Sequence, residues 1–356
     1  MTSKLDKLRH LMMENSVDAV IVAEDRNRRY YSGYTGTDAY LLILADKSYL
    51  ITDFRYVEQA KAQCPGYEVV EAYGKKAYEF IKQTCDKAGA KRVWFEDDTL
   101  TVKEYSEIKA SLDPLELVPD TGRIAKPRIL KTDDEVNNIR KAAQLADKGF
   151  SHILNFIRPG VTERDIALEL EFFLRKNGSE GLAFPIIAAS GPNGALPHAE
   201  PTDDKLAYGI LLTLDFGCVI NGYCSDMTRT VALGEPPEKL KVIYNIVLEA
   251  QEKALAFIKA GISGIEADKQ AREHIIAHGY GDYFGHGLGH GVGLHIHEAP
   301  RLSPIGETIL EPGMVVSVEP GIYLPGLGGV RIEDLVVITE DGYDNLVSSR
   351  KDLIIL

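Results

Sequence analysis

The chain has 356 residues, 45% hydrophobic side chains and a formal net charge of −13. This length predicts one large or two ordinary domains. The negative charge argues against nucleic acid or an anionic membrane as the main partner. We find no apolar run near the roughly 18 residues that span a bilayer, and the charged start lacks the apolar core of a signal peptide. Four cysteines without a CxxC pair favour a reducing cytoplasm.

Residues 1–125 alternate helical and strand patterns, which predicts a small α/β domain. The apolar runs in DAVIVAE, AYLLILAD, SYLITD and RVWFED indicate strands. The segments RYVEQAKAQC and KKAYEFIKQTCDKAGA have the periodicity of helices. Residues 126–131 are expected to form a linker.

Residues 132–356 are expected to form a second, α+β domain. Thr132 and Glu135 have the spacing of a capping box, which predicts a helix start. Four helices are predicted, at about 133–157, 163–177, 237–259 and 264–278. Each pair of helices precedes strand-like segments that carry carboxylates, so a weak pseudo-twofold repeat is expected.

The segment ILLTLDFGCVINGYCSDMTRTVAL predicts a hairpin with a type I′ turn at Asn221-Gly222. This turn sets Asp215 opposite Thr228 and Asp226 opposite Gly217, on one face of the hairpin. The two aspartates would then be diagonal neighbours, roughly 7–8 Å apart by backbone. We expect Gly217 to leave space for an ion between them. The alternative is that both aspartates face solvent.

Four histidines, His286, His290, His295 and His297, lie in one glycine-rich run. Two further carboxylates follow: Glu319 ends the apolar run MVVSVEPG, and Glu333 lies in GVRIEDLVVI. Either glutamate alone would suit an edge strand or a turn. One imidazole with four carboxylates makes an oxygen-rich site, which favours two hard divalent ions such as Mn²⁺, with Co²⁺ also possible, over a structural Zn²⁺ site. Two such ions can activate water and polarise a carbonyl oxygen.

The segments DFG…YCSDMTRT, GHGVGLHIHEAP, SVEPGIY and GVRIED resemble the signature segments of the pita-bread metallopeptidases. The segments NRRYYSGYTG and TDFRYVEQA resemble the N-terminal domain of prolidases and aminopeptidase P. The resemblance covers nearly the whole chain. It implies an α/β N-terminal domain plus an α+β pita-bread catalytic domain, and its length is similar to short prokaryotic Xaa-Pro dipeptidases.

The resemblance also implies a ligand set for two metal ions. The donor set favours Mn²⁺ or Co²⁺, with Zn²⁺ possible. The implied ligands are Asp215, Asp226, His290, Glu319 and Glu333. Asp226 and Glu333 would bridge both ions. Glu319 would also carry the proton from the nucleophile to the leaving nitrogen.

Other residues would act around the implied metal site. His198 and His297 would line the substrate pocket, with His297 orienting the scissile carbonyl or stabilising the tetrahedral intermediate. Tyr323 and Arg331 would support the ligands. Arg301, four residues after His297, is our candidate for binding the carboxylate of a dipeptide substrate, and the alternative is an exposed loop residue.

Some histidines have no role from the resemblance. His295 stands where many relatives carry an acidic residue, and a wall or surface position is expected for it. For His286 a pocket role and a structural role are equally open. The remaining histidines in helical patterns are expected to be structural: His10, His152, His274 and His278.

The leading hypothesis is therefore a dinuclear enzyme that cleaves Xaa-Pro dipeptides. An aminopeptidase P acting on longer peptides is the alternative. A metal-free enzyme such as creatinase, or a non-enzymatic binding module, would be expected to lack ligands that this chain retains. Methionine aminopeptidases usually lack the N-terminal domain. Relatives suggest a homodimer in which the small domain of one chain borders the active site of the other.

Overall fold

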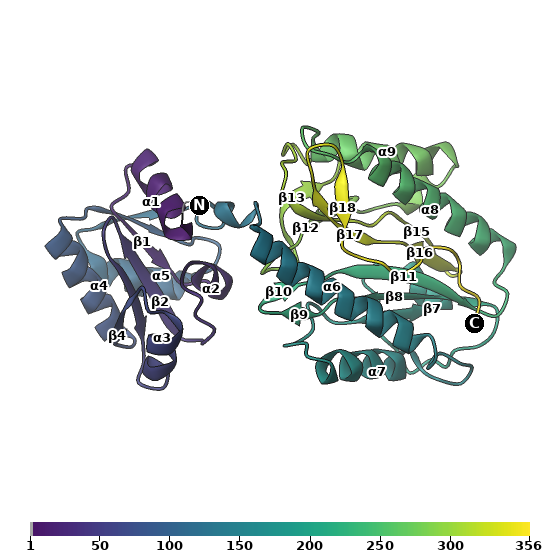
Figure 1. Ribbon diagram of the computed structural model, residues 1–356, viewed down its shortest axis with the longest axis horizontal. Coiled ribbons are helices and arrows are strands. Elements are labelled where there is room, and N and C mark those ends of the chain that lie inside the picture. Colours follow the sequence, from purple (N-terminus) through teal and green to yellow (C-terminus); the bar gives the residue numbers. More distant parts are fainter. Residues whose placement is uncertain (1–2) are drawn as a thin grey trace. The chain divides into compact units, whose positions relative to one another are not determined.

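The computed structural model describes residues 3–356, drawn in Figure 1. The chain forms two compact units that divide between Arg128 and Ile129. Within residues 3–356, no helix combines the length and the apolar character that crossing a membrane requires.

The first unit is built on a six-stranded mixed sheet with the order β4-β3-β2-β1-β5-β6. Its strands are β1 Ala19–Val22, β2 Ala39–Leu44, β3 Ser48–Thr52, β4 Glu68–Glu71, β5 Arg92–Phe95 and β6 Glu116–Pro119. The β1–β2 and β2–β3 pairs are antiparallel, and the other three pairs are parallel. Strands β1 and β3 are fully buried, as their continuous apolar runs predicted.

Helices connect and cover these strands. They are α1 Lys4–Glu14, α2 Asp25–Ser32, α3 Val57–Gln63, α4 Lys75–Ala88 and α5 Val102–Leu112. The α3 and α4 helices confirm the two predicted from RYVEQAKAQC and KKAYEFIKQTCDKAGA. The sequence DRNRRYYS of α2 has no apolar periodicity that would predict a helix. Its ends are nevertheless defined, because Glu24 caps the first turn and Gly33, with φ 79°, ends the helix.

The predicted linker 126–131 is divided between the two units. Lys126–Arg128 form a short 3-10 helix, and Arg128 donates from Nη1 to Oδ1 of Asn27 in the first unit at 2.8 Å. Lys131 instead forms a buried ion pair of 2.8 Å with Glu298 of the second unit. Contacts thus hold both ends of the linker segment.

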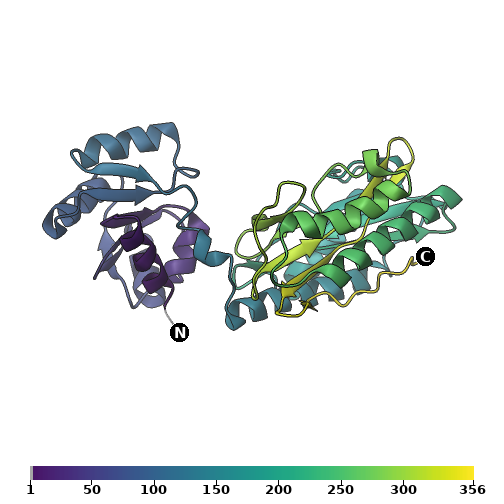
Figure 2. The ribbon, with the colours of Figure 1, turned by 90° about the horizontal axis from the view of Figure 1, so that it is seen from above.

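The second unit contains two helix pairs, which the sequence predicted. They are α6 Asp133–Ile153, α7 Glu163–Lys176, α8 Glu238–Phe257 and α9 Gly264–Ala277. The capping box of Thr132 and Glu135 is present at the start of α6. Figures 1 and 2 show α8 and α9 running side by side, and their apolar faces share one core with strands β14 to β17.

The strands of the second unit form several small sheets. They are β7 Ile187–Ser190, β8 Ile210–Phe216, β9 Val219–Ile220, β10 Tyr223–Cys224, β11 Met227–Leu233, β12 Gly289–Gly291, β13 Glu298–Leu302, β14 Val315–Val318, β15 Gly321–Leu324, β16 Gly328–Arg331, β17 Asp334–Ile338 and β18 Tyr343–Asn345. Two sheets have the orders β11-β8-β7 and β13-β12-β14-β17-β18. Two short hairpins, β9–β10 and β15–β16, complete the unit.

Candidate metal centre

A hairpin positions the first two carboxylates. Asn221 and Gly222 both have positive φ, at 50° and 80°, as a type I′ turn requires. Beyond the turn, Thr228 of β11 pairs with Asp215 of β8, which confirms the predicted register. Asp226 lies between β10 and β11, where the ladder is interrupted, and not inside a strand as expected.

The expectation that Gly217 leaves space for an ion was wrong. A Cβ atom at Gly217 would lie 1.9 Å from the carbonyl oxygen of Ser225 and 3.1 Å from Cβ of Ala183. Glycine is required here because the two halves of the hairpin approach closely. The space between the aspartates is therefore not provided by the missing side chain.

The two candidate glutamates lie at the ends of strands. Glu319 follows β14, and Glu333 lies between β16 and β17. The backbone N–H of Glu333 donates to the carbonyl of Thr228 at 3.1 Å, which joins the second half of the unit to the hairpin. His290 is the central residue of β12. Among the four carboxylates, only Asp215 lies inside a strand.

The structure brings these five side chains together. One carboxylate oxygen from each of Asp215, Asp226 and Glu333 lies within 4.8 Å of the others. Nε2 of His290 lies 3.6 Å from Oδ2 of Asp226 and 3.3 Å from Oε1 of Glu319. The cluster thus combines carboxylates and one imidazole, a donor set that suits hard divalent cations.

Two oxygens in this cluster are buried without a hydrogen-bond partner among the described residues: Oδ1 of Asp215 and Oε1 of Glu333. The second oxygen of each carboxylate is held. Arg331 donates from Nη2 to Oδ2 of Asp215 at 2.6 Å, and Thr228 donates its hydroxyl to Oε2 of Glu333 at 2.7 Å. An unpaired buried carboxylate oxygen is costly, so both fit coordination of a cation.

The pKa shifts in the metal-free cluster also indicate a binding site for cations. Burial raises the pKa of Asp226 well above its usual value, and the nearby charge of Glu333 adds to the effect. Burial likewise raises the pKa of Glu333, with Glu319 and Asp215 contributing. The pKa of Asp215 is raised by burial although Arg331 opposes the shift. Like charges this close need a cation to remain ionised.

Glu319 and His290 form a contrasting pair. Burial alone would raise the pKa of Glu319, but the hydrogen bond and charge of His290 lower it to about 2. Burial alone would lower the pKa of His290, and the same bond raises it. The hydroxyl of Ser317 connects them, because it accepts from the backbone N–H of His290 and donates to Oε1 of Glu319, each at 3.1 Å.

A chain of hydrogen bonds runs from the cluster to His286, whose role the sequence left open. Nη1 of Arg331 donates to the hydroxyl of Tyr323 at 2.8 Å, and Nε2 of His286 lies 2.8 Å from the same hydroxyl. Nδ1 of His286 faces the carbonyl of Gly287, which can only accept, so this nitrogen carries the proton. Tyr323 therefore donates to Nε2, and burial lowers the pKa of His286, which keeps the ring neutral.

The two histidines expected to line the substrate pocket, His198 and His297, are more exposed than the proposed metal ligands. His297 is exposed, and its ring centroid lies 4.4 Å from that of His290. Partial burial lowers the pKa of His297, and the neighbouring charges of His290 and His198 contribute to the lowering. His198 is also exposed, and it follows Pro197, whose carbonyl accepts from Arg331 at 3.3 Å. The ring of His295 lies 6.4 Å from that of His297.

Arg301 lies directly opposite His290 in the β12–β13 ladder, and it is exposed. Residues directly opposite in an antiparallel pair project from the same face. The guanidinium therefore extends from the face of the sheet that carries the candidate ligand. No signal in the sequence gave this pairing, since a β-bulge shifts the register between His290 and Gly291.

Comparison with known proteins decides the family. Residues 137–340 match the model of metallopeptidase family M24, and residues 4–130 match the creatinase/prolidase N-terminal domain. The chain belongs to metallopeptidase family M24. This confirms the predicted fold, in which an α/β N-terminal domain precedes a pita-bread catalytic domain. The family is one of hydrolases with a site for divalent metal ions.

Individual members of family M24 are similar over almost their whole length. The Xaa-Pro dipeptidase of Pyrococcus furiosus is 40% identical, with 99% of this chain and 100% of the relative covered. The structure of an Xaa-Pro dipeptidase from Bacillus anthracis has a TM-score of 0.96 at 48% identity, covering 99% of both chains. An X-Pro aminopeptidase from Thermotoga maritima has a TM-score of 0.90 at 36% identity, covering 96% of this chain and 98% of that one.

Proposed function

We propose that this chain is an Xaa-Pro dipeptidase that uses two divalent metal ions. The main observation behind this proposal is the buried cluster of Asp215, Asp226 and Glu333. One oxygen from each lies within 4.8 Å of the others, and two oxygens of the cluster have no hydrogen-bond partner among residues 3–356. The similarity to two Xaa-Pro dipeptidases supports the substrate class.

The metal ligands in this proposal are Asp215, Asp226, His290, Glu319 and Glu333. The carboxylate-rich set favours Mn²⁺ or Co²⁺, with Zn²⁺ possible. When bound, two such ions supply an activated water and polarise the scissile carbonyl. An Xaa-Pro bond lacks the N–H that peptidases use to bind an extended backbone, so a site that binds the carbonyl suits this substrate.

Protein side chains would then perform the proton transfers and the positioning. Glu319 can accept a proton and deliver it to the leaving proline nitrogen, which needs one before it departs. His297 would orient the scissile carbonyl, and His198 would line the pocket beside it. Tyr323 and Arg331 would hold the ligands through the contacts described above.

Arg301 would select for dipeptides by binding the substrate's terminal carboxylate. Its position opposite His290 and its exposure support this role. The second candidate function is that of an aminopeptidase P, which the similarity to the Thermotoga enzyme favours. Hydrolysis of Ala-Pro and Ala-Pro-Gly-Gly, each with defined Mn²⁺, Co²⁺ or Zn²⁺, tests the proposal. Preference for Ala-Pro supports the dipeptidase, and preference for the tetrapeptide contradicts it.

We also propose that the enzyme works as a homodimer in the cytoplasm. The four cysteines are buried free thiols, which suits a reducing compartment. Phe54, in the segment that resembles the prolidase N-terminal domain, is 75% exposed, and a second chain could cover it. Light scattering should give twice the chain mass of 39.3 kDa, and a mass of one chain would contradict the dimer.

A further inference from the structure

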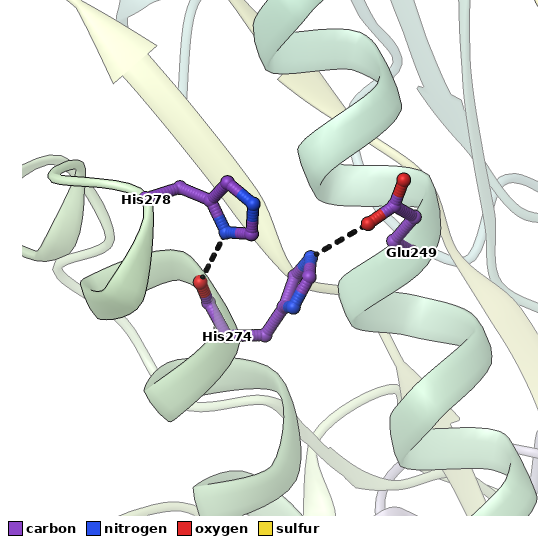
Figure 3. A group of neighbouring side chains, drawn as sticks. All are labelled: Glu249, His274 and His278. Atoms are coloured by element: carbon purple, nitrogen blue, oxygen red, sulfur yellow. Dashed lines mark hydrogen bonds and ion pairs between the residues drawn. The ribbon is translucent and has the colours of Figure 1, made fainter.

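A second group of metal-ligating side chains lies outside the carboxylate cluster, between helices α8 and α9. It consists of Glu249 on α8, His274 on α9 and His278, which caps the C-terminus of α9. One ligand atom from each of the three lies within 4.8 Å of the others. Figure 3 shows both imidazole rings turned toward Glu249. The sequence had suggested only structural roles for the two histidines.

The backbone fixes the state of the His278 ring. Its Nδ1 lies 2.9 Å from the backbone carbonyl oxygen of His274. Because a carbonyl only accepts, Nδ1 carries the proton and Nε2 keeps its lone pair. A hydrogen bond of this kind commonly orients a histidine that binds a metal through its other nitrogen. Histidines four residues apart also share one face of a helix, as in helical zinc sites.

His274 offers the second nitrogen from a buried position. The residue is 7% exposed, and its Nε2 finds no hydrogen-bond partner within ideal geometry among the described residues, although Oε2 of Glu249 lies only 3.2 Å away. Burial lowers the pKa of His274, and the charge of Lys253 lowers it further, so the ring is neutral near pH 7. A neutral imidazole can bind a cation through Nε2 once this nitrogen gives up its proton.

We propose that Glu249, His274 and His278 bind a Zn²⁺ ion that links α8 to α9. Two imidazoles and one carboxylate are a donor set that zinc prefers, with water filling the fourth position. This set differs from the carboxylate-rich catalytic cluster, which favours harder ions. The proposal goes beyond the proposed peptidase function and does not depend on it.

Lys253 competes with this ion. Its Nζ lies 2.7 Å from Nδ1 of His274 and donates to it, which holds the ring proton on Nε2. Binding through Nε2 requires the proton to move to Nδ1 and the ammonium group to turn away. Lys253 is exposed, so it can leave without losing buried contacts. The ammonium group of Lys253 therefore lowers the affinity of the site for Zn²⁺ but does not prevent binding.

The test is a Zn²⁺ titration of the full-length, metal-stripped chain by equilibrium dialysis. To prevent Zn²⁺ from binding at the carboxylate cluster, the chain carries the substitutions Asp226→Asn and Glu333→Gln. We expect one bound Zn²⁺ per chain. Adding His278→Gln should weaken binding by more than about tenfold, and adding Lys253→Met should tighten it. The matched control is His10→Gln, which removes an exposed histidine from another helix and should change nothing.

Equal Zn²⁺ affinity with and without His278 would overturn the proposal, as would Lys253→Met binding that is equal or weaker. His278 is exposed at a helix end, so its replacement should leave the fold intact, and circular dichroism of the metal-free variant checks this. In the otherwise unchanged enzyme, His278→Gln should retain peptidase activity. The zinc site and the peptidase function can therefore fail independently.

Discussion

Arg331 holds one oxygen of Asp215 and leaves the other free. Its Nη2 donates to Oδ2 at 2.6 Å, while Oδ1 is buried without a hydrogen bond from the described residues. Because the same guanidinium also contacts Thr228 and Tyr323, its planar shape fixes the carboxylate in one orientation. One oxygen of this carboxylate lies within 4.8 Å of oxygens of Asp226 and Glu333.

This relationship predicts that Arg331→Lys weakens metal binding although the charge is kept. Lysine cannot make the three contacts at once, so Asp215 should lose its orientation. We expect Mn²⁺ affinity to fall by roughly 10- to 100-fold, measured by equilibrium dialysis. Arg350→Lys, at an exposed arginine paired with Asp352, is the control. Unchanged affinity in the Arg331 variant would show that Asp215 needs no such support.

Removal of metal should abolish the peptidase activity. Four carboxylates carry too much charge for a single divalent ion, so activity should return with about two ions per chain, as measured by elemental analysis. A thoroughly stripped sample that keeps full activity would refute the metal requirement.

Asp226 and His295 should differ in their importance. Asp226 lies within the oxygen cluster, whereas His295 is not a proposed ligand, and its ring centroid lies 6.4 Å from that of His297. We therefore expect Asp226→Ala to abolish kcat and His295→Ala to leave most of it. Equal losses in two folded variants would contradict the proposed ligand set.

Arg301→Ala should reduce the preference of the enzyme for dipeptides over longer peptide substrates. A charge-assisted hydrogen bond contributes roughly 1.5–3 kcal/mol, which is about one to two decades in kcat/KM. The kcat/KM for Ala-Pro should fall by this factor. Ala-Pro-Gly-Gly has no carboxylate at that position, so its kcat/KM should fall less. The measurement is the ratio of kcat/KM for the two substrates. A ratio equal to that of the wild type would favour the aminopeptidase alternative.

A buried ion pair behind the cluster should stabilise the catalytic domain. Arg229 donates to Oδ1 of Asp334 at 2.7 Å and to the backbone carbonyl of Glu333, and both charged side chains are almost fully buried. Asp334→Ala would leave the Arg229 charge unpaired, so we expect a loss of about 3–5 kcal/mol in urea unfolding. Asp344→Ala, in a surface pair with Arg140, should cost about 0–1 kcal/mol.

The pH dependence of this contribution follows from the pKa of Asp334. Burial alone would raise it, but Arg229 and Lys351 lower it below the usual value of 3.8. The folded chain therefore keeps this carboxylate ionised where the unfolded chain protonates it. Its stabilising effect should be complete above about pH 4 and lost as the pH falls through the lowered pKa. A difference between wild type and Asp334→Ala that grows in acid would contradict this.

Local sequence signals predicted much of the fold. The Asn221-Gly222 turn allowed the register of Asp215 against Thr228 to be predicted, because a two-residue turn fixes every pair that follows it. The capping box at Thr132 likewise located the start of α6. Such signals act over a few residues and need no knowledge of the rest of the chain.

Contacts between distant segments could not be predicted in this way. The space at Gly217 was misjudged because the approach of Ser225 depends on how the hairpin bends. The position of Arg301 opposite His290 depends on a β-bulge, and the bonds from His286 through Tyr323 to Arg331 join three separate segments. The resemblance to a family supplied the ligand set, but not these connections.

The raised pKa values of Asp226 and Glu333 have a consequence for how the enzyme acquires its ions. The metal-free cluster keeps its protons to a higher pH than separate carboxylic acids would. Loading is therefore an exchange reaction, in which protons leave as cations enter. Because burial raises these pKa values, the fraction of chains that hold metal should depend on the pH of the surrounding solution.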